Sequence, residues 1–367
     1  MPLLSHHRRR LPPSPDRRCG GALPVSRRRG RLRLVSMLLT GAAVSACGSP
    51  GSASPTPSAV RSSAGPSSTP AATASSTPSL PQVTLAGCGP PRDAHALQVV
   101  HTFAVSPDDI AVGDAGRLWV TAREANQLIG ISASGGTDRA VTTQTVSGGP
   151  EGVASDGSTL LVAQQDRNAI AVVTPAPSSA SHTLVSFPNP TSNAGIDGIA
   201  IDAAGHRLLV PDSPTGQLFA VSLAAPAPAT TGPALPATAA SAPSSPPQLL
   251  GSGLGRPVAA ATDPAGNVYV ASESTPGLSV ISPSGAKRPL GHFTDLDEVV
   301  YHAGLLYVTE LDHRDVLAVD PSSGASAAVS VNLPSPQGLA VTASGTLEIV
   351  DSITNTLYSM PACGVPG

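Results

Sequence analysis

The sequence predicts an all-β fold, a six-bladed β-propeller, and two observations carry that prediction. First, a unit of about 27 residues recurs six times beyond residue 95, with successive starts 39 to 61 residues apart. Second, each copy contains three short apolar runs separated by turn residues, such as GIAID, NVYVAS and QLFAVS. Runs of this length, rich in Val, Leu and Ile, are typical of strands in a meander. Four-stranded units repeated around a ring are propeller blades.

Each copy supplies three strands, and the connection that follows it has room for a fourth. HTLVSFP (182–188) and AAVSVNLP (327–334) are examples of such fourth strands. The six copies span residues 106–132, 149–175, 195–222, 256–282, 295–320 and 335–360.

The ring needs one strand from the other end of the chain to close it. ALQVVHTFAV (96–105) precedes the first unit, and we expect it to be the outer strand of the last blade. Cys88 lies just before this segment and Cys363 just after the last unit, so the propeller is predicted over residues 88–363. In an oxidising compartment we expect Cys88 and Cys363 to form a disulfide, worth about 5 kcal/mol in the chain-entropy model. Two free thiols are the alternative.

The N-terminal part has the pattern of an exported lipoprotein. Residues 1–47 end in a basic segment, an apolar run too short to span a bilayer, and Val44-Ser45-Ala46-Cys47. The last four residues resemble the bacterial lipobox, whose Cys receives a lipid, which makes Cys47 the predicted lipidation site. An ordinary cleaved signal peptide with a chance Cys is the alternative. We expect export through the Sec route, although Arg27–Arg29 weakly resemble a twin-arginine motif.

Two low-complexity segments flank or interrupt the predicted propeller. Residues 48–86 consist almost entirely of Ser, Pro, Thr, Ala and Gly up to Gln82, and such a composition predicts a disordered stalk. Residues 224–247 have a similar composition and are predicted to be an insertion between the third and fourth strands of blade 3. The lipobox-like motif and the stalk together predict that the propeller lies at the outer face of the cell membrane, held by a lipid on Cys47.

Charge separates the leader from the rest of the chain. Residues 1–47 contain ten Arg and one Asp, whereas residues 48–367 contain eleven basic and 23 acidic residues. An acidic body argues against nucleic-acid binding and favours cations or cationic partners. We expect a monomer whose partner is an envelope ligand or protein that the sequence does not identify.

The loops that lead into the innermost strands, here called leading loops, carry a second repeated feature. In a propeller these loops lie on the same face as the loops between the second and third strands, which include Glu273. Carboxylates and one amide in the leading loops are thus expected to converge on the channel mouth, where oxygen ligands suit Ca²⁺ or Mg²⁺. Polar, solvated turns are the alternative. The predicted ligands are Asp108, Glu151, Asp197, Asp297 and Gln337; the fourth blade has Val258 at this position.

Other polar residues are assigned no chemistry. Asp114, Asp202 and Asp263 lie in the turns of the opposite face, each two or three residues before a Gly, and are interpreted as turn formers. The nine His show no metal-ligand spacing, and no GxSxG, P-loop, EF-hand or CxxC motif is present.

The repeats at 106–360 resemble the blades of the NHL, streptogramin-lyase and SMP-30/gluconolactonase propeller families. GRLWVTAREANQLIG (116–130) is similar to the lyase blade that carries the active site, although the lyase has His where this chain has Asp108. IDGIAIDAAGHRLLV (196–210) resembles the SMP-30 segment whose leading Asp binds the catalytic metal. The resemblance maps that ligand to Asp197 and the Glu of a Glu-Gly metal motif to Glu151.

Three hypotheses for function follow. The first is a non-catalytic, envelope-anchored binding module whose acidic face takes a ligand or protein partner through a divalent cation. The second is a metal-dependent, SMP-30-like lactonase or hydrolase that uses Asp197 and Glu151. The third is a purely structural propeller whose acidic rim keeps it soluble.

Overall fold

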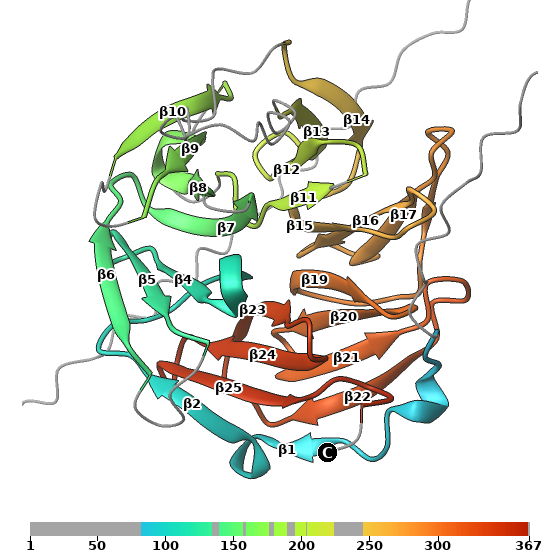
Figure 1. Ribbon diagram of the computed structural model, residues 1–367. Coiled ribbons are helices and arrows are strands. Elements are labelled where there is room, and N and C mark those ends of the chain that lie inside the picture. The colour runs from blue at the N-terminus through green and yellow to red at the C-terminus, as the bar shows by residue number, and fades with distance from the viewer. Residues whose placement is uncertain are drawn as a thin grey trace, which may run out of the picture. The chain divides into compact units, whose positions relative to one another are not determined.

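The computed structural model is a six-bladed β-propeller, as the repeats predict (Figure 1). It describes residues 82–133, 139–156, 159–175, 180–188, 195–202, 204–223 and 245–365. The predicted signal peptide, most of the stalk (48–81) and residues 224–244 of the insertion lie outside this part of the chain. Within it, no helix has the length and apolar character needed to cross a membrane.

Each blade is an antiparallel meander whose first strand lines the centre of the ring and whose fourth forms the rim (Figure 1). Blade 1 contains β3 (Ile110–Val112), β4 (Leu118–Ala122), β5 (Gln127–Ile131) and β6 (Val141–Thr145). Blade 2 contains β7 (Pro150–Asp156), β8 (Thr159–Gln164), β9 (Ala169–Val173) and β10 (Ser181–Ser186). Blade 3 contains β11 (Ala200–Asp202), β12 (Arg207–Asp212), β13 (Gln217–Ser222) and β14 (Gln248–Ser252).

The second half of the ring follows the same order. Blade 4 contains β15 (Pro257–Thr262), β16 (Val268–Ser272), β17 (Leu278–Ile281) and β18 (Lys287–Pro289). Blade 5 contains β19 (Leu296–His302), β20 (Leu305–Glu310), β21 (Asp315–Val319) and β22 (Ser326–Val331). Blade 6 contains β23 (Pro336–Val341), β24 (Thr346–Asp351) and β25 (Thr356–Pro361). Short 3₁₀ helices occur at Leu85–Gly87, Ala94–Ala96, Asp114–Gly116 and Gln165–Arg167.

The ring closes through the N-terminal segment, which confirms the expected outer strand. β2 (Gln98–Thr102) pairs antiparallel with β25 and completes blade 6. A disulfide joins Cys88 to Cys363, as predicted. The sequence did not indicate β1 (Arg92–Asp93), which adds a parallel fifth strand to the outer edge of blade 5.

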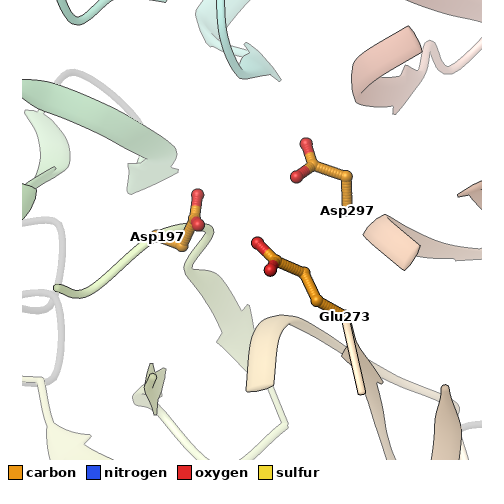
Figure 2. Close-up of side chains that lie close together, drawn as sticks. All are labelled: Asp197, Glu273 and Asp297. Atoms are coloured by element: carbon orange, nitrogen blue, oxygen red, sulfur yellow. The ribbon is translucent and has the colours of Figure 1, made fainter. Parts of the chain in front are cut away.

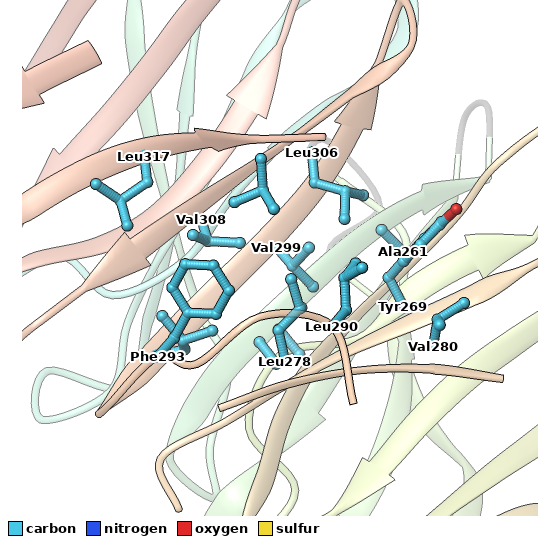
Figure 3. Packing of buried hydrophobic residues seen from close by; sticks show 14 of the residues in the cluster. Ala261, Tyr269, Leu278, Val280, Leu290, Phe293, Val299, Leu306, Val308 and Leu317 are labelled. Carbon is cyan, nitrogen blue, oxygen red and sulfur yellow. The ribbon is translucent and has the colours of Figure 1, made fainter. Parts of the chain in front are cut away.

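The core lies between neighbouring blades. One apolar cluster fills the space between blades 4 and 5, where Leu278 and Leu290 contact Val299 and Leu306 (Figure 3). These side chains are almost fully buried. At about 25 cal/mol per Å² of apolar surface removed from water, each contributes on the order of 2 kcal/mol. The apolar runs of the repeat are therefore the blade faces, which explains their unbroken hydrophobic character.

In blades 1 and 5, a Thr hydroxyl of the second strand forms a hydrogen bond to the following blade. The Thr121 hydroxyl of β4 donates to the Glu151 carbonyl of blade 2 and accepts from the Asp109 N–H at 3.0 Å. The Thr309 hydroxyl of β20 repeats this arrangement, donating to the Gln337 carbonyl of blade 6 at 3.1 Å. Both Thr side chains are fully buried, so the leading loops of blades 2 and 6 are held by buried hydrogen bonds.

A candidate metal centre at the channel mouth

Irregular pairing marks the start of several innermost strands. The register of β7 on β8 shifts between Pro150 and Val153, and that of β19 on β20 shifts between Leu296 and Val299. A comparable shift interrupts β23. Bulges of this kind change the direction of side chains next to functional sites. The three bulges contain the predicted ligands Glu151, Asp297 and Gln337, each together with the residue that follows it.

Three carboxylates from consecutive blades meet at the channel mouth (Figure 2). Asp197 lies just before β11 in blade 3, Glu273 follows β16 in blade 4, and Asp297 lies in β19 of blade 5. One oxygen of each lies within 4.8 Å of the others, and all three side chains are partly exposed. We call Asp197, Glu273 and Asp297 the mouth cluster.

Glu273 is the member that the leading-loop pattern does not include. The pattern assigns blade 4 to Val258, but Val258 is fully buried in the core between blades 4 and 5. Glu273 instead extends from the loop after the second strand into the space between Asp197 and Asp297 (Figure 2). The sequence offered one indication of this role: Glu273 lies in a loop between a second and a third strand, and these loops share the face of the leading loops.

The other predicted ligands lie beside the cluster. Asp108, Glu151 and Gln337 line a cavity of about 180 Å³ that they share with Arg123. The Gln337 amide donates to the Ser335 hydroxyl at 3.0 Å. Asp108 and Gln337 are not part of the mouth cluster. Glu151 is not part of it either, but the charges of both Asp197 and Asp108 raise the pKa of Glu151.

Two arginines offset part of the negative charge. Arg256 forms an ion pair with Glu273. Arg123 lies 3.0 Å from Asp166, 3.1 Å from Glu124 and, through Nε, 3.6 Å from Glu151 Oε2. These contacts leave Asp108, Asp197 and Asp297 without an ion pair in the part of the chain that the structure describes.

Burial and mutual repulsion raise the pKa of the mouth carboxyls. Burial is the main cause for Asp197 and Asp297, whose pKa values lie well above the ordinary value, and the neighbouring carboxylates add to it. The same causes raise the pKa of Glu151 to about 12, against the opposing charge of Arg123. The pKa of Asp108 rises to about 7, through burial first and then Asp109. Holding these groups ionised at neutral pH requires a compensating positive charge.

A second pair of acids lies just below the mouth. Asp109 and Glu298 follow Asp108 and Asp297, are almost fully buried, and form a hydrogen bond between their carboxyl groups. Asp109 also accepts from the Val153 N–H at 2.7 Å and from the Ile110 N–H at 2.6 Å. Because burial and the Asp109 charge raise the pKa of Glu298 well above the ordinary value, Glu298 is the protonated partner.

Glycines provide the space for this pair. Gly198 and Gly338 occupy the corresponding position in blades 3 and 6. A Cβ on Gly198 would lie 3.3 Å from Glu298 Oε2, and one on Gly338 would lie 2.9 Å from Asp109 Oδ1 and 2.6 Å from its Cα. The absence of side chains at these two positions therefore leaves room for the two carboxyl groups, and the approach at Gly338 is too close for any side chain without a shift of the backbone.

The donor set at the mouth fits a divalent cation. Glu151 Oε2 is buried without a hydrogen-bond partner. Among the described residues, no hydrogen bond reaches the carboxylates of Asp197 or Asp297, so their lone pairs are available. Oxygen-only donors of this kind suit Ca²⁺ and Mg²⁺ rather than softer metals.

No family model matches the sequence, and no curated protein matches it either. Several solved structures share the fold. A calcium-binding protein, regucalcin, from Agrobacterium tumefaciens has a TM-score of 0.58 at 12% identity, with 75% of this chain and 99% of that chain covered. A gluconolactonase from Xanthomonas campestris has a TM-score of 0.57 at 16% identity, with 78% and 97% covered.

The third similar structure belongs to a different group. A catalytically inactive virginiamycin B lyase from Staphylococcus aureus, solved with quinupristin, has a TM-score of 0.51 at 14% identity and covers 73% of this chain and 86% of that chain. Identities this low establish the propeller fold alone, and they confirm the predicted fold resemblance to SMP-30-like and streptogramin-lyase-like propellers.

Proposed function

We propose that this protein is an envelope-anchored binding propeller that takes a divalent cation, Ca²⁺ or Mg²⁺, at its mouth and recognises its ligand through that cation. The observation that carries the proposal is the mouth cluster, in which carboxylate oxygens of Asp197, Glu273 and Asp297 lie within 4.8 Å of one another. Three carboxylates this close repel one another, and a bound cation would turn that repulsion into attraction.

The remaining mouth residues support this role. Glu151 has a buried oxygen without a hydrogen-bond partner, and Asp108 and Gln337 complete the oxygen-rich surroundings. A bound Ca²⁺ would neutralise the cluster and offer open coordination positions to carboxylate or hydroxyl oxygens of a ligand. The lipid anchor at Cys47 and the position outside the cell membrane are part of the proposal and rest on the sequence motif.

The test is a titration of the purified chain, first stripped with EDTA, with Ca²⁺ and with Mg²⁺ by calorimetry and thermal melting. We expect binding with a raised melting temperature. Asp197→Asn, Glu273→Gln and Asp297→Asn should each weaken binding at least about tenfold, because each removes one charged ligand. Asp312→Asn is the matched control, since Asp312 is an exposed acid of the same face. Absence of binding for both cations would overturn the proposal.

A lactonase-like hydrolase is the second candidate, favoured by one observation. The cavity beside the cluster holds Asp108, whose pKa of about 7 suits a general base, together with Arg123, a potential contact for an anionic substrate group. The same preparations should be assayed with a panel of sugar lactones. Cation-dependent turnover that Asp108→Asn abolishes, while cation binding persists, would select this candidate over a binding module.

A further inference from the structure

A second cavity opens on the face opposite the mouth, between blades 6 and 1. Its volume is about 490 Å³, which lies in the range of small-molecule sites. The start of β24, the end of β25 and the start of β2 form one wall, and the turns of blade 1 form the other. The lining of the cavity includes Gln98, Leu118, Ala133, Arg139, Glu348 and Ser359.

Glu348 is an unexpected residue on this wall. It belongs to β24, where Leu347, Ile349 and Val350 are fully buried, and its own exposed fraction is 3%. Across the sheet it faces Ser359, which in turn faces Gln98, so a polar row crosses blade 6 at the cavity. The Oε2 atom of Glu348 is buried and has no hydrogen-bond partner within the part of the chain that the structure describes. A buried acceptor without a partner is costly and requires an explanation.

Arg139 presents the complementary problem in the same cavity. Its Nε–H is buried and also lacks a hydrogen-bond partner in the described ranges. Its positive charge lowers the pKa of Glu348, but burial outweighs this effect and raises that pKa to about 7. No ion pair or hydrogen bond joins Arg139 to Glu348 among the described residues. One cavity therefore contains a carboxylate oxygen and a guanidinium N–H that have no hydrogen-bond partner among the described residues.

We propose that this cavity binds a small dipolar molecule of the amino-acid class, whose ammonium group contacts Glu348 and whose carboxylate contacts Arg139. A zwitterion carries one donor group, the ammonium, and one acceptor group, the carboxylate, which correspond in kind to the Glu348 oxygen and the Arg139 N–H. Charge-assisted hydrogen bonds at both ends are the strong kind. No aromatic ring lines the cavity in the described part of the chain, which disfavours a stacked base or ring as occupant.

This site does not depend on the mouth. It lies on the opposite face, shares no residue with the mouth cluster, and requires no cation. Its success or failure is therefore separable from that of the proposed function.

The experiment screens the twenty amino acids at millimolar concentration against the purified full-length chain, by ligand-observed NMR and thermal melting, in EDTA. Propylamine and propionate, which each carry one of the two charged groups, are the matched partial probes. We expect at least one amino acid to bind and both partial probes to bind at least about tenfold more weakly. The proposal is overturned when no amino acid binds, which would mean that water fills the cavity.

Variants locate the binding. Glu348→Gln and Arg139→Gln should each weaken the binding of the amino acid at least about tenfold, because each removes one charged contact. Ala133→Trp places a ring at the exposed rim and should block entry while both charged groups remain. Arg314→Gln on the mouth face is the control. Binding that survives all three cavity variants would assign it elsewhere and overturn the proposal.

Discussion

Asp109 of blade 1 and Glu298 of blade 5 share a hydrogen bond between their carboxyl groups in the central channel. Each also accepts a backbone N–H at the start of its own inner strand, at 2.6 Å for Ile110 and 2.7 Å for Val299. Asp109 further accepts from Val153 of blade 2. Two side chains thus connect three blades directly beneath the proposed metal centre.

Removal of Asp109 should destabilise the propeller. Asp109→Ala leaves the Val153 N–H and the Glu298 carboxyl without partners, and we expect the free energy of unfolding to fall by about 3 kcal/mol. Glu298→Gln keeps a donor for Asp109 and should cost less than about 1 kcal/mol. Guanidinium unfolding followed by circular dichroism measures both. Asp114→Ala, at an exposed turn, is the control; equal effects of Asp109→Ala and Asp114→Ala would contradict the structural role.

Stability without metal should fall as the pH rises. The pKa values of Asp108 and Asp109 are about 7 in the folded chain, above the ordinary value of 3.8. The folded state therefore binds more protons than the unfolded state between these values. This contribution is complete below pH 4 and is lost as the pH rises through 7.

The measurement is guanidinium unfolding in EDTA at pH 5.5 and at pH 8. We expect the free energy of unfolding to be lower at pH 8 by at least about 1 kcal/mol. Added Ca²⁺ should reduce the difference, because the cation replaces the protons as the compensating charge. A stability that increases over this interval in EDTA would contradict the prediction.

Arg256 should weaken cation binding at the mouth. Its ion pair with Glu273 occupies one carboxylate of the mouth cluster. Arg256→Gln releases that carboxylate and removes one positive charge, and we expect the affinity for Ca²⁺ to increase about fivefold, or about 1 kcal/mol. Calorimetric titration checks this. Arg314→Gln removes the same charge from an exposed position of this face and should have little effect; a loss of affinity in Arg256→Gln would oppose the proposed ligand set.

The disulfide should be a major source of stability. Replacing Cys88 and Cys363 together by Ala removes a cross-link that closes a loop of 275 residues. We expect the free energy of unfolding to fall by about 5 kcal/mol, the value of the chain-entropy model. Guanidinium unfolding of both proteins, with and without a reductant, provides the measurement. Reductant should lower the stability of the parent chain and leave the double variant unchanged.

The sequence predicted much of the fold because the repeat is regular. Six copies of one pattern determine six blades, and the position of residues 96–105 before the first copy determines which strand closes the ring. β1 was not predicted, since a two-residue strand carries no alternation of apolar and polar residues. The pairing of Cys88 with Cys363 followed from the positions of these residues at the two ends of the ring.

The site was predicted less completely, for a geometric reason. The leading loops correctly predicted Asp197 and Asp297 as members of the mouth cluster, because successive blades repeat the same backbone path. Glu273 comes from a different loop, the one after β16, whereas Val258 at the leading position of blade 4 is buried in the core. The pairing of Asp109 with Glu298 depends on space left by Gly198 and Gly338, and no single blade's sequence shows that space.

The N-terminal connection determines how a pull on the chain would be distributed. The chain meets the propeller at Val83, whose N–H donates to the Ala303 carbonyl at 2.7 Å in a turn of the face opposite the mouth. Cys88 is bonded to Cys363, beyond the end of β25, before the outer strand β2 begins. Tension on the N-terminal segment would therefore pass through a covalent bond to Cys363, just beyond β25, which pairs with β24 on one side and with β2 on the other. The edge strand β2, which pairs only with β25 in its sheet, would not carry this load first.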